Sequence, residues 1–303
     1  MIDFHLHTTA SDGDFSFEQV VEMAAEKKLT AIAVTDHDTT KSARKITGKE
    51  PVTVIPGIEL SVYDFELDYM DVHVLGLFID PENPSLLSKL ETLKKQREDQ
   101  KKETISKIVA LGYPMTFEEA ASKARGSVGR PHIAKVLVEK YPEDFPDVKS
   151  VFDRLIGNGR PAYVDRKDSL TMEEAVRMIH DAGGIAVLAH PFLYEYDATK
   201  IVSDFKNAGG DGMEVYYDYE TNANRRISHD LKTDKEPEHF QALLSSENFS
   251  NSFMAEKGEE LAERFGLLES GGSDFHGSSK DQKFGDFGAP DEVFDKMKEA
   301  IKT

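Results

Sequence analysis

The chain contains no cysteine in its 303 residues. Disulfide bonds, thiolate metal sites and cysteine nucleophiles are therefore excluded, and any bound metal must be held by nitrogen and oxygen ligands. Long apolar runs are also absent, because the longest covers about five residues and a membrane span needs about 20. There is neither an internal repeat nor a low-complexity tract. We therefore expect a folded protein that has no membrane partner.

Positive charge is scarce relative to negative charge. The 37 Lys and Arg residues face 56 Asp and Glu residues, which gives a formal net charge of −19. This balance argues against broad binding to nucleic acid or membranes, and we expect no stable nucleic-acid partner. The N-terminus reads directly as a strand rather than as a signal peptide, so the expected location is cytoplasmic. The length suits one large α/β domain or two domains.

The first strand carries two histidines. Apolar and polar residues alternate over residues 2–7, which is the period of a β-strand. His5 and His7 therefore point to the same face, with Cα atoms roughly 6–7 Å apart. Two imidazoles in this arrangement can share one metal ion, and Asp12 in the following turn can add a carboxylate. The alternative is a strand with two exposed histidines.

Further apolar runs end in histidine or carboxylate residues, and six of the ten histidines lie in these stretches or in the first strand. The stretches are Thr35-Asp36-His37-Asp38, Pro56-Gly57-Ile58-Glu59, Val72-His73-Val74-Leu75-Gly76, Ala189-His190-Pro191 and Ser273-Asp274-Phe275-His276-Gly277. About nine nitrogen and oxygen ligands exceed the roughly four that one zinc ion needs. We therefore expect two to three divalent ions, Mn, Fe or Zn, with one bridging carboxylate. Such a cluster lowers the pKa of a bridging water and clamps a phosphoryl group.

The periodic segments favour an α/β barrel of parallel strands with the ligands at the carboxyl ends. We expect strands at 31–35, 52–55, 70–78, 185–189 and 212–217, with a bend at Pro56-Gly57. We expect helices at 17–28, 172–182, 201–208, 254–265 and 292–301. Residues 222–252 are polar and weakly periodic, which favours a loop. Glu214 ends a strand and could support a metal ligand, but we do not assign it this role.

Residues 81–164 interrupt the barrel pattern. They favour helices, including a long one that starts near Leu86, and they hold 15 Lys and Arg against 12 Asp and Glu. Of the two predicted parts of the chain, only this segment therefore has net positive charge, +3, while the remainder carries −22. A charged stretch of this kind is usually a solvated face. The alternative is a cationic lid over an anionic substrate.

The histidine and carboxylate stretches resemble, in content and order, the motifs of the polymerase and histidinol phosphatase (PHP) family. Residues 129–134, Gly-Arg-Pro-His-Ile-Ala, and 159–164, Gly-Arg-Pro-Ala-Tyr-Val, are similar to the bacterial branch that includes nucleoside 3′,5′-bisphosphate phosphatases. The resemblance implies a distorted (β/α)7 TIM-like barrel formed by 1–80 and 165–303. The helical insertion, or lid domain, is then 81–164.

Carried over by position, the resemblance implies three metal sites and assigns their ligands. The first site is His5, His7, Glu59 and Asp274; the second is Glu59, His73 and His190; the third is Asp12, His37 and His276. Glu59, Asp274, His190 and Arg130 are then the expected catalytic residues. Arg130, His132 and Arg160 are the expected substrate-binding residues, because an Arg fork can bind a phosphate through two donors.

The resulting hypothesis is a metal-dependent phosphoesterase in which a metal-bridged hydroxide attacks a small nucleotide. A nucleoside 3′,5′-bisphosphate would then yield phosphate and a monophosphate such as AMP. One alternative is a 5′→3′ exonuclease on short RNA, which the net negative charge mildly disfavours. Others are a metal-dependent amidohydrolase and a non-catalytic metal-binding module.

Overall fold

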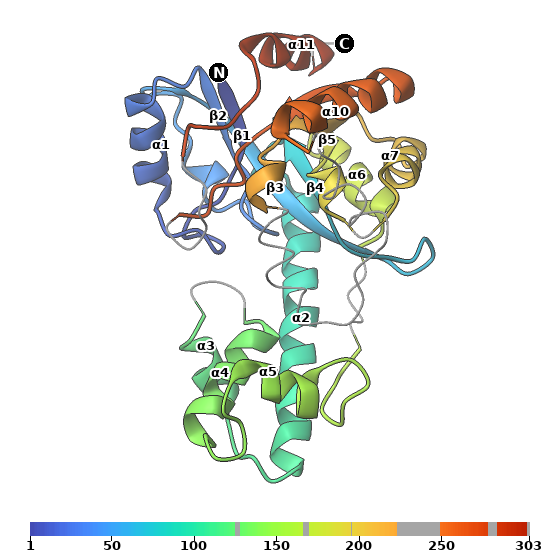
Figure 1. The fold of residues 1–303 in the computed structure, drawn as a ribbon. Coiled ribbons are helices and arrows are strands. Elements are labelled where there is room, and N and C mark those ends of the chain that lie inside the picture. The colour runs from blue at the N-terminus through green and yellow to red at the C-terminus, as the bar shows by residue number, and fades with distance from the viewer. Residues whose placement is uncertain (125–127, 166–169, 195, 223–248, 278–283, 302–303) are drawn as a thin grey trace. The chain divides into compact units, whose positions relative to one another are not determined.

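The computed structural model describes residues 1–124, 128–165, 170–194, 196–222, 249–277 and 284–301. The chain divides into two compact units, residues 1–87 with 170–303 and residues 88–169. Most of the expected loop at 222–252 lies outside the described residues. Figure 1 shows the elements of both units.

The first unit contains a seven-stranded sheet whose strands follow one another in chain order. The strands are β1 (Ile2–Leu6), β2 (Ala31–Val34), β3 (Thr53–Asp64), β4 (Tyr69–Leu77), β5 (Ile185–Leu188), β6 (Gly212–Tyr216) and β7 (Leu268–Gly271). The helices of this unit are α1 (Phe17–Glu26), α6 (Met172–Asp181), α7 (Ala198–Asn207), α10 (Asn251–Phe265) and α11 (Asp291–Ile301), with 3₁₀ turns at Ala43–Lys45 and Pro191–Leu193. Helix α2 (Pro84–Ala110) runs from this unit into the other.

The sheet closes into a distorted barrel. A parallel bridge joins Leu6 to Phe275, and Ile2 bridges Ala289. Gly272 makes the closure possible, because a Cβ atom there would lie 2.5 Å from Cβ of His5. The expected α/β barrel of the TIM-like class is therefore confirmed.

The expectation of purely parallel strands is wrong for β4. This strand runs antiparallel to both β3 and β5, whereas the other neighbouring pairs are parallel. The bend expected at Pro56-Gly57 is also wrong, because β3 continues through it. Pro56 is the last β3 residue paired with β2, and Gly57 is the first paired with β4. The missing N–H of proline therefore falls where the strand changes partner.

The register between β1 and β2 shifts between Asp3 and Leu6. Phe4 consequently packs with strands β2–β5 and with Phe294 of α11, with ring centroids 5.5 Å apart. Leu6 packs instead in the cluster that contains α1. Such irregularities occur often beside active sites, because they redirect side chains. Here His5 and His7 both still face the same cluster of polar groups.

Helix starts follow local capping rules. Ser16 before α1 and Thr171 before α6 each accept a hydrogen bond from the backbone N–H of the third helical residue, which is Gln19 or Glu174. The side chains of Gln19 and Glu174 in turn accept hydrogen bonds from the backbone N–H groups of Ser16 and Thr171, so both helices begin with a complete capping box.

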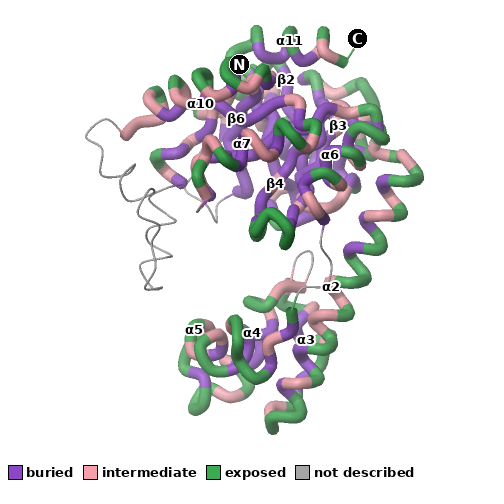
Figure 2. Tube along the Cα trace, turned by 90° about the vertical axis from the view of Figure 1, so that its right-hand side faces the viewer, coloured by how far each residue is buried: buried purple, intermediate pink, exposed green. Residues whose placement is uncertain are grey.

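The second unit is helical and has its own core. Besides α2 it contains α3 (Phe117–Ala121), α4 (Arg130–Lys140), α5 (Val148–Val151) and a π-helical turn at Phe152–Ile156. Ile108, Ile133, Leu137 and Phe145 are among its fully buried residues. Figure 2 shows buried residues on the inward faces of these helices and along the strands of the first unit. In the described part of the chain, we find no helix with the length and apolar character needed to cross a membrane.

Candidate metal centre

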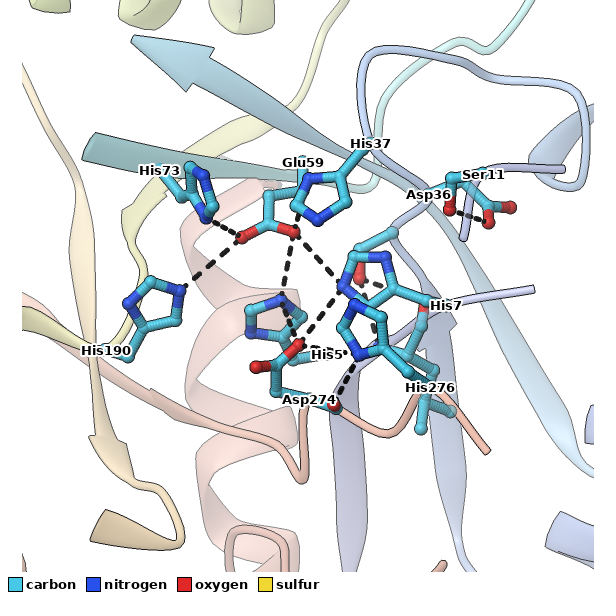
Figure 3. A network of polar contacts seen from close by, with 12 residues as sticks. His5, His7, Ser11, Asp36, His37, Glu59, His73, His190, Asp274 and His276 are labelled. Carbon is cyan, nitrogen blue, oxygen red and sulfur yellow. Dashed lines mark hydrogen bonds and ion pairs between the residues drawn. The ribbon is translucent and has the colours of Figure 1, made fainter. Parts of the chain in front are cut away.

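Glu59 of β3 lies at the centre of a cluster of histidines (Figure 3). Its side chain is almost fully buried. Oε1 lies 2.8 Å from Nδ1 of His73 and 3.6 Å from Nε2 of His190. Oε2 lies 3.3 Å from Nε2 of His5, 3.1 Å from Nε2 of His7 and 3.0 Å from Nδ1 of His37. The two oxygens of the Glu59 carboxylate thus contact two different sets of imidazoles.

Asp274 and Asp12 bring in the remaining histidine. Oδ1 of Asp274 lies 3.3 Å from Nε2 of His7 and 3.3 Å from Nδ1 of His276. Oδ2 of Asp12 lies 3.3 Å from Nε2 of His276 and 4.0 Å from Nε2 of His37. Each sequence-predicted metal ligand therefore belongs to one connected cluster.

The donor atoms form three groups in which all atoms lie within 4.8 Å of one another. The groups are His7, Asp12, His37 and His276; His5, His7 and Asp274; and His37, Glu59 and His73. This differs in detail from the family-implied assignment. His37 also joins Glu59 and His73, whereas His190 is near Glu59 but in none of the three groups.

Six of the seven strands position these residues. His5, Glu59 and His73 lie within β1, β3 and β4, while His7, His37, His190 and the pair Asp274 and His276 follow β1, β2, β5 and β7. Glu59 and His73 are mid-strand because β3 and β4 continue into a long hairpin (Figure 1). His190 and Asp274 have left-handed backbone conformations, with φ of 30° and 52°. Such backbone strain in non-glycine residues is characteristic of functional sites.

The electrostatics of the cluster follow from burial and proximity. Burial favours the neutral form of Glu59, but His37, His73 and His5 outweigh it and hold its pKa well below the ordinary value. Burial also opposes charge on His7 and His73, yet nearby carboxylates, Glu59 among them, raise their pKa values to about 9 and about 10. For His37 burial dominates, and its pKa falls to about 4. In the metal-free chain, the protons on His7 and His73 thus balance the negative charge of the buried carboxylates.

The donor atoms fit divalent metal ions. Among the described residues, Nε2 of His5, Nδ1 of His37, Nδ1 of His73 and both oxygens of Glu59 are buried without a hydrogen-bond partner. Buried polar atoms normally have such partners, so their accumulation at one point requires an explanation. Imidazole and carboxylate donors without sulfur suit Zn, Mn or Fe. The cluster therefore has the chemistry of a metal centre.

Several buried residues beside the cluster hold these donors in place. The Asp36 carboxylate accepts hydrogen bonds from Thr8 and Ser11, and so fixes the loop between His7 and Asp12. Asp3 accepts from the backbone and hydroxyl of Ser273, beside Asp274.

Two further contacts involve tyrosines. The Tyr217 hydroxyl donates to Oδ2 of Asp274 at 2.9 Å, and the Tyr194 hydroxyl accepts from the backbone N–H of His73 at 2.8 Å. The sequence indicates such a role for Asp36 and Asp38, because these two carboxylates flank His37. The partners from distant segments depend on the three-dimensional fold.

The three predicted substrate-binding residues lie in the helical unit. Arg130 begins α4, and its guanidinium lies 5.8 Å from the ring centroid of Phe152 and 5.7 Å from that of Tyr163. The motifs at 129–134 and 159–164 therefore pack together. Nδ1 of His132 accepts a hydrogen bond from the backbone N–H of Gly129 at 2.9 Å. Arg160 lies in an exposed turn.

Comparison with known proteins identifies the relatives of this chain. The PHP domain family model matches residues 3–182. A 5′-3′ exoribonuclease of Haemophilus influenzae is 34% identical over 70% of this chain and 78% of its own length. A phosphoribosyl 1,2-cyclic phosphate 1,2-diphosphodiesterase of Eggerthella lenta is 31% identical over 91% of this chain and 94% of its own length. A 3′,5′-nucleoside bisphosphate phosphatase of Chromobacterium violaceum is 32% identical over 71% of this chain and 76% of its own length.

Solved structures share the architecture. A structure described as an amidohydrolase from Chromobacterium violaceum, with bound sulfate and no metal, has a TM-score of 0.64 and 28% identity, covering 92% of this chain and 89% of that one. A structure from Bifidobacterium adolescentis has a TM-score of 0.66 and 23% identity, covering 98% of this chain and 94% of that one. The second likeness concerns the fold alone.

Proposed function

This chain belongs to the PHP domain family and is a metal-dependent phosphoesterase, and we propose that it removes phosphate from a small nucleotide. A nucleoside 3′,5′-bisphosphate, converted to a 5′-monophosphate such as AMP, is the substrate that we favour. The observation that carries the proposal is the carboxylate of Glu59 among five histidines, each with a ring nitrogen within 3.6 Å of it. The whole cluster offers six histidines and three carboxylates, and these nine donor residues suit two to three divalent ions, Mn, Fe or Zn.

We assign the ligands as His5, His7, Asp12, His37, Glu59, His73, His190, Asp274 and His276. When bound, the ions supply an activated water and neutralise charge on the phosphoryl group. The protein's part is to fix their spacing. Oε1 of Glu59 faces His73 and His190 while Oε2 faces His5, His7 and His37, so the two oxygens of this side chain would suit two different ions. Asp274 adds a second carboxylate that balances the positive charge.

We propose that Arg130 and His132 bind the substrate. Phe152 and Tyr163 hold the Arg130 guanidinium, which can offer two donors to a phosphate. Burial and, to a smaller extent, the positive charge of Lys135 lower the pKa of His132, so its ring is neutral at neutral pH. Because Nδ1 accepts from Gly129, the proton is on Nε2, where it can donate to a phosphate or sugar oxygen. Arg160 is proposed to bind a second phosphate.

A second candidate is hydrolysis of a cyclic sugar phosphate. It is favoured by the similarity to the Eggerthella lenta diphosphodiesterase, because that match covers 91% of this chain. The matches to the exoribonuclease and the bisphosphate phosphatase cover only about 70%. Exonuclease action on short RNA is supported by the exoribonuclease relative, although the net charge of −19 disfavours long polyanions. Amide hydrolysis is suggested by the description of one structural neighbour.

A substrate panel tests the proposal. Protein reconstituted separately with Mn²⁺, Fe²⁺ and Zn²⁺ is assayed with adenosine 3′,5′-bisphosphate, a 5′-phosphorylated RNA trinucleotide, phosphoribosyl 1,2-cyclic phosphate and an N-acetyl amino acid. We expect the largest kcat/KM with the bisphosphate and release of one phosphate per AMP. A larger kcat/KM with the trinucleotide or the cyclic phosphate would replace the substrate assignment, and turnover of the amide alone would contradict phosphoesterase function.

A further inference from the structure

Strand β6 differs from the other strands of the barrel. Among the described residues, each of the other six strands supplies a proposed metal ligand within the strand or shortly after it, whereas β6 supplies none. It nevertheless carries a fully buried carboxylate, Glu214, in its middle. A buried carboxylate is costly unless it is paired, so its partners indicate its role.

Both oxygens of Glu214 are engaged by proposed ligands. Oε1 and Oε2 each lie 3.1 Å from Nδ1 of His5. Oε2 also accepts a hydrogen bond from the backbone N–H of His190 at 2.8 Å. Because these partners occupy the carboxylate, Glu214 is placed as a support for ligands rather than as a ligand.

The contact with His5 determines where its ring carries the proton. An ionised carboxylate only accepts hydrogen bonds, so Nδ1 of His5 must be the donor. The neutral ring then has its lone pair on Nε2. That atom lies 3.3 Å from Oε2 of Glu59 and 3.5 Å from Oδ1 of Asp274, and has no hydrogen-bond partner among the described residues. The lone pair therefore points toward the proposed ligands of the same ion.

The contact with His190 supports a strained backbone. His190 has φ of 30° and ψ of 56°, a left-handed conformation that non-glycine residues rarely adopt. It lies two residues beyond the end of β5 and precedes Pro191, which donates no backbone hydrogen bond. The bond from the His190 N–H to Glu214 therefore helps to hold the conformation that turns this imidazole toward Glu59.

We propose that Glu214 is a positioning residue of the metal centre, which orients the imidazole of His5 and fixes the backbone of His190. A carboxylate behind a ligating histidine fixes its tautomer and raises its affinity for metal. The assignment rests on the metal centre of the proposed function but not on its substrate. Loss of metal affinity in a variant would therefore support it whichever phosphate ester is hydrolysed.

Glu214→Gln is the direct test, because it keeps the size of the side chain but replaces one acceptor oxygen with an amide donor. Isothermal titration of the metal-free full chain with Mn²⁺ should show a 10- to 100-fold weaker affinity. Excess Mn²⁺ should restore most of the lost kcat while KM changes little. The matched control is Glu269→Gln, whose carboxylate accepts from the Tyr216 hydroxyl on the neighbouring strand. This control should bind Mn²⁺ like the wild type.

Two results would overturn the proposal. One is a Glu214→Gln affinity for Mn²⁺ within about threefold of wild type, a ratio well below the effect expected of a supporting carboxylate. The other comes from the wild-type protein and does not depend on the variant folding. In the ¹⁵N-histidine spectrum of the Zn²⁺-loaded chain, the proton of His5 should be on Nδ1, and a proton on Nε2 contradicts the role. The His5 signal is assigned by its loss in His5→Asn.

Discussion

At the scale of single residues, the cluster depends on a few buried carboxylates surrounded by imidazoles. The side chain of Glu59 is only 1% exposed and contacts five histidines from four segments of the chain. In a metal-free chain, such a group is tolerated because protonated histidines such as His7 and His73 neutralise it. Bound metal ions would take over this neutralising role.

Glu59→Gln should remove the bridging charge while keeping the shape of the side chain. We expect turnover to fall by about 10²–10³-fold, comparable with the loss of one strong electrostatic contact in a transition state. Circular dichroism and thermal melting should show that the fold is retained. A folded variant that hydrolyses the substrate at a rate near that of wild type would contradict the bridging assignment.

Metal binding should tighten as the pH rises. The pKa values of His7 and His73, about 9 and about 10, mean that metal ions must displace protons from both residues. Apparent affinity should therefore increase between about pH 7 and about pH 9, with release of protons to the buffer. Titration calorimetry in buffers of different ionisation enthalpy measures both effects. A pH-independent affinity without proton release would rule out displacement of protons from histidine.

The same protons affect the metal-free fold with a defined sign. Because the folded-state pKa values are raised, they add stability below the ordinary histidine pKa of about 6.5. This contribution is lost progressively as the pH rises from about 6.5 through the folded-state pKa values of about 9 and about 10. Denaturant unfolding of the chelated protein should therefore show stability falling over that range. The metal-loaded protein should show a smaller loss, because ions have replaced the protons.

At the scale of elements, the sequence predicted most strands and helices but not every strand direction. The alternation of apolar and polar residues predicted β1, whereas short continuous apolar runs predicted β2 and β5. The antiparallel course of β4 could not be predicted, because its composition fits either direction. The passage of β3 through Pro56 was missed because local rules cannot show a change of pairing partner.

The residues of the cluster could be predicted because they lie in or after apolar strands and belong to short local patterns. Glu214 could not be assigned in this way. Its carboxylate acts on His5, which lies 209 positions away in the sequence. The same limit applies to Tyr217 and its contact with Asp274. Such contacts become visible only when the barrel places distant strands side by side.

The N-terminus of α4 provides the test of substrate recognition. Arg130→Ala should lower kcat/KM for a nucleoside bisphosphate by about 10- to 150-fold, because a charge-assisted contact contributes about 1.5–3 kcal/mol. Metal content should not change, since arginine is not a ligand. Hydrolysis of a minimal aryl phosphate should suffer less if Arg130 holds the non-reacting part of the nucleotide.

Arg154→Ala is the matched control for this experiment. Arg154 belongs to the same helical unit and also contacts an aromatic ring, that of Phe145 at 5.0 Å, but lies in neither of the two motifs. It should leave both activities near the wild-type level. Small, equal losses for Arg130→Ala on the two substrates would remove this residue from substrate recognition.

At the scale of the whole molecule, all nine proposed ligands belong to one compact unit, residues 1–87 with 170–303. The helical unit has a separate core around Ile108, Ile133 and Phe145. Binding of ions should therefore stabilise the two units unequally, since a ligand stabilises only the folded state that contains its site.

Hydrogen exchange measures this difference within the intact chain. Adding Mn²⁺ to chelated protein should slow exchange in peptides from β1, β3, β4 and the segment after β7. Peptides from α4 and α5 should change little in the absence of substrate. Equal protection in both units would show that metal binding is not confined to the barrel unit.

The metal content of the purified chain tests the central claim most directly. After complete chelation and reconstitution with Mn²⁺, Fe²⁺ or Zn²⁺, the protein is passed through a desalting column, and ions per chain are counted by mass spectrometry. The nine nitrogen and oxygen donors predict two to three ions per chain and loss of phosphoesterase activity in excess chelator. Fewer than about one ion per chain, or full activity in excess chelator, would contradict a multinuclear site that needs roughly three or four ligands per ion.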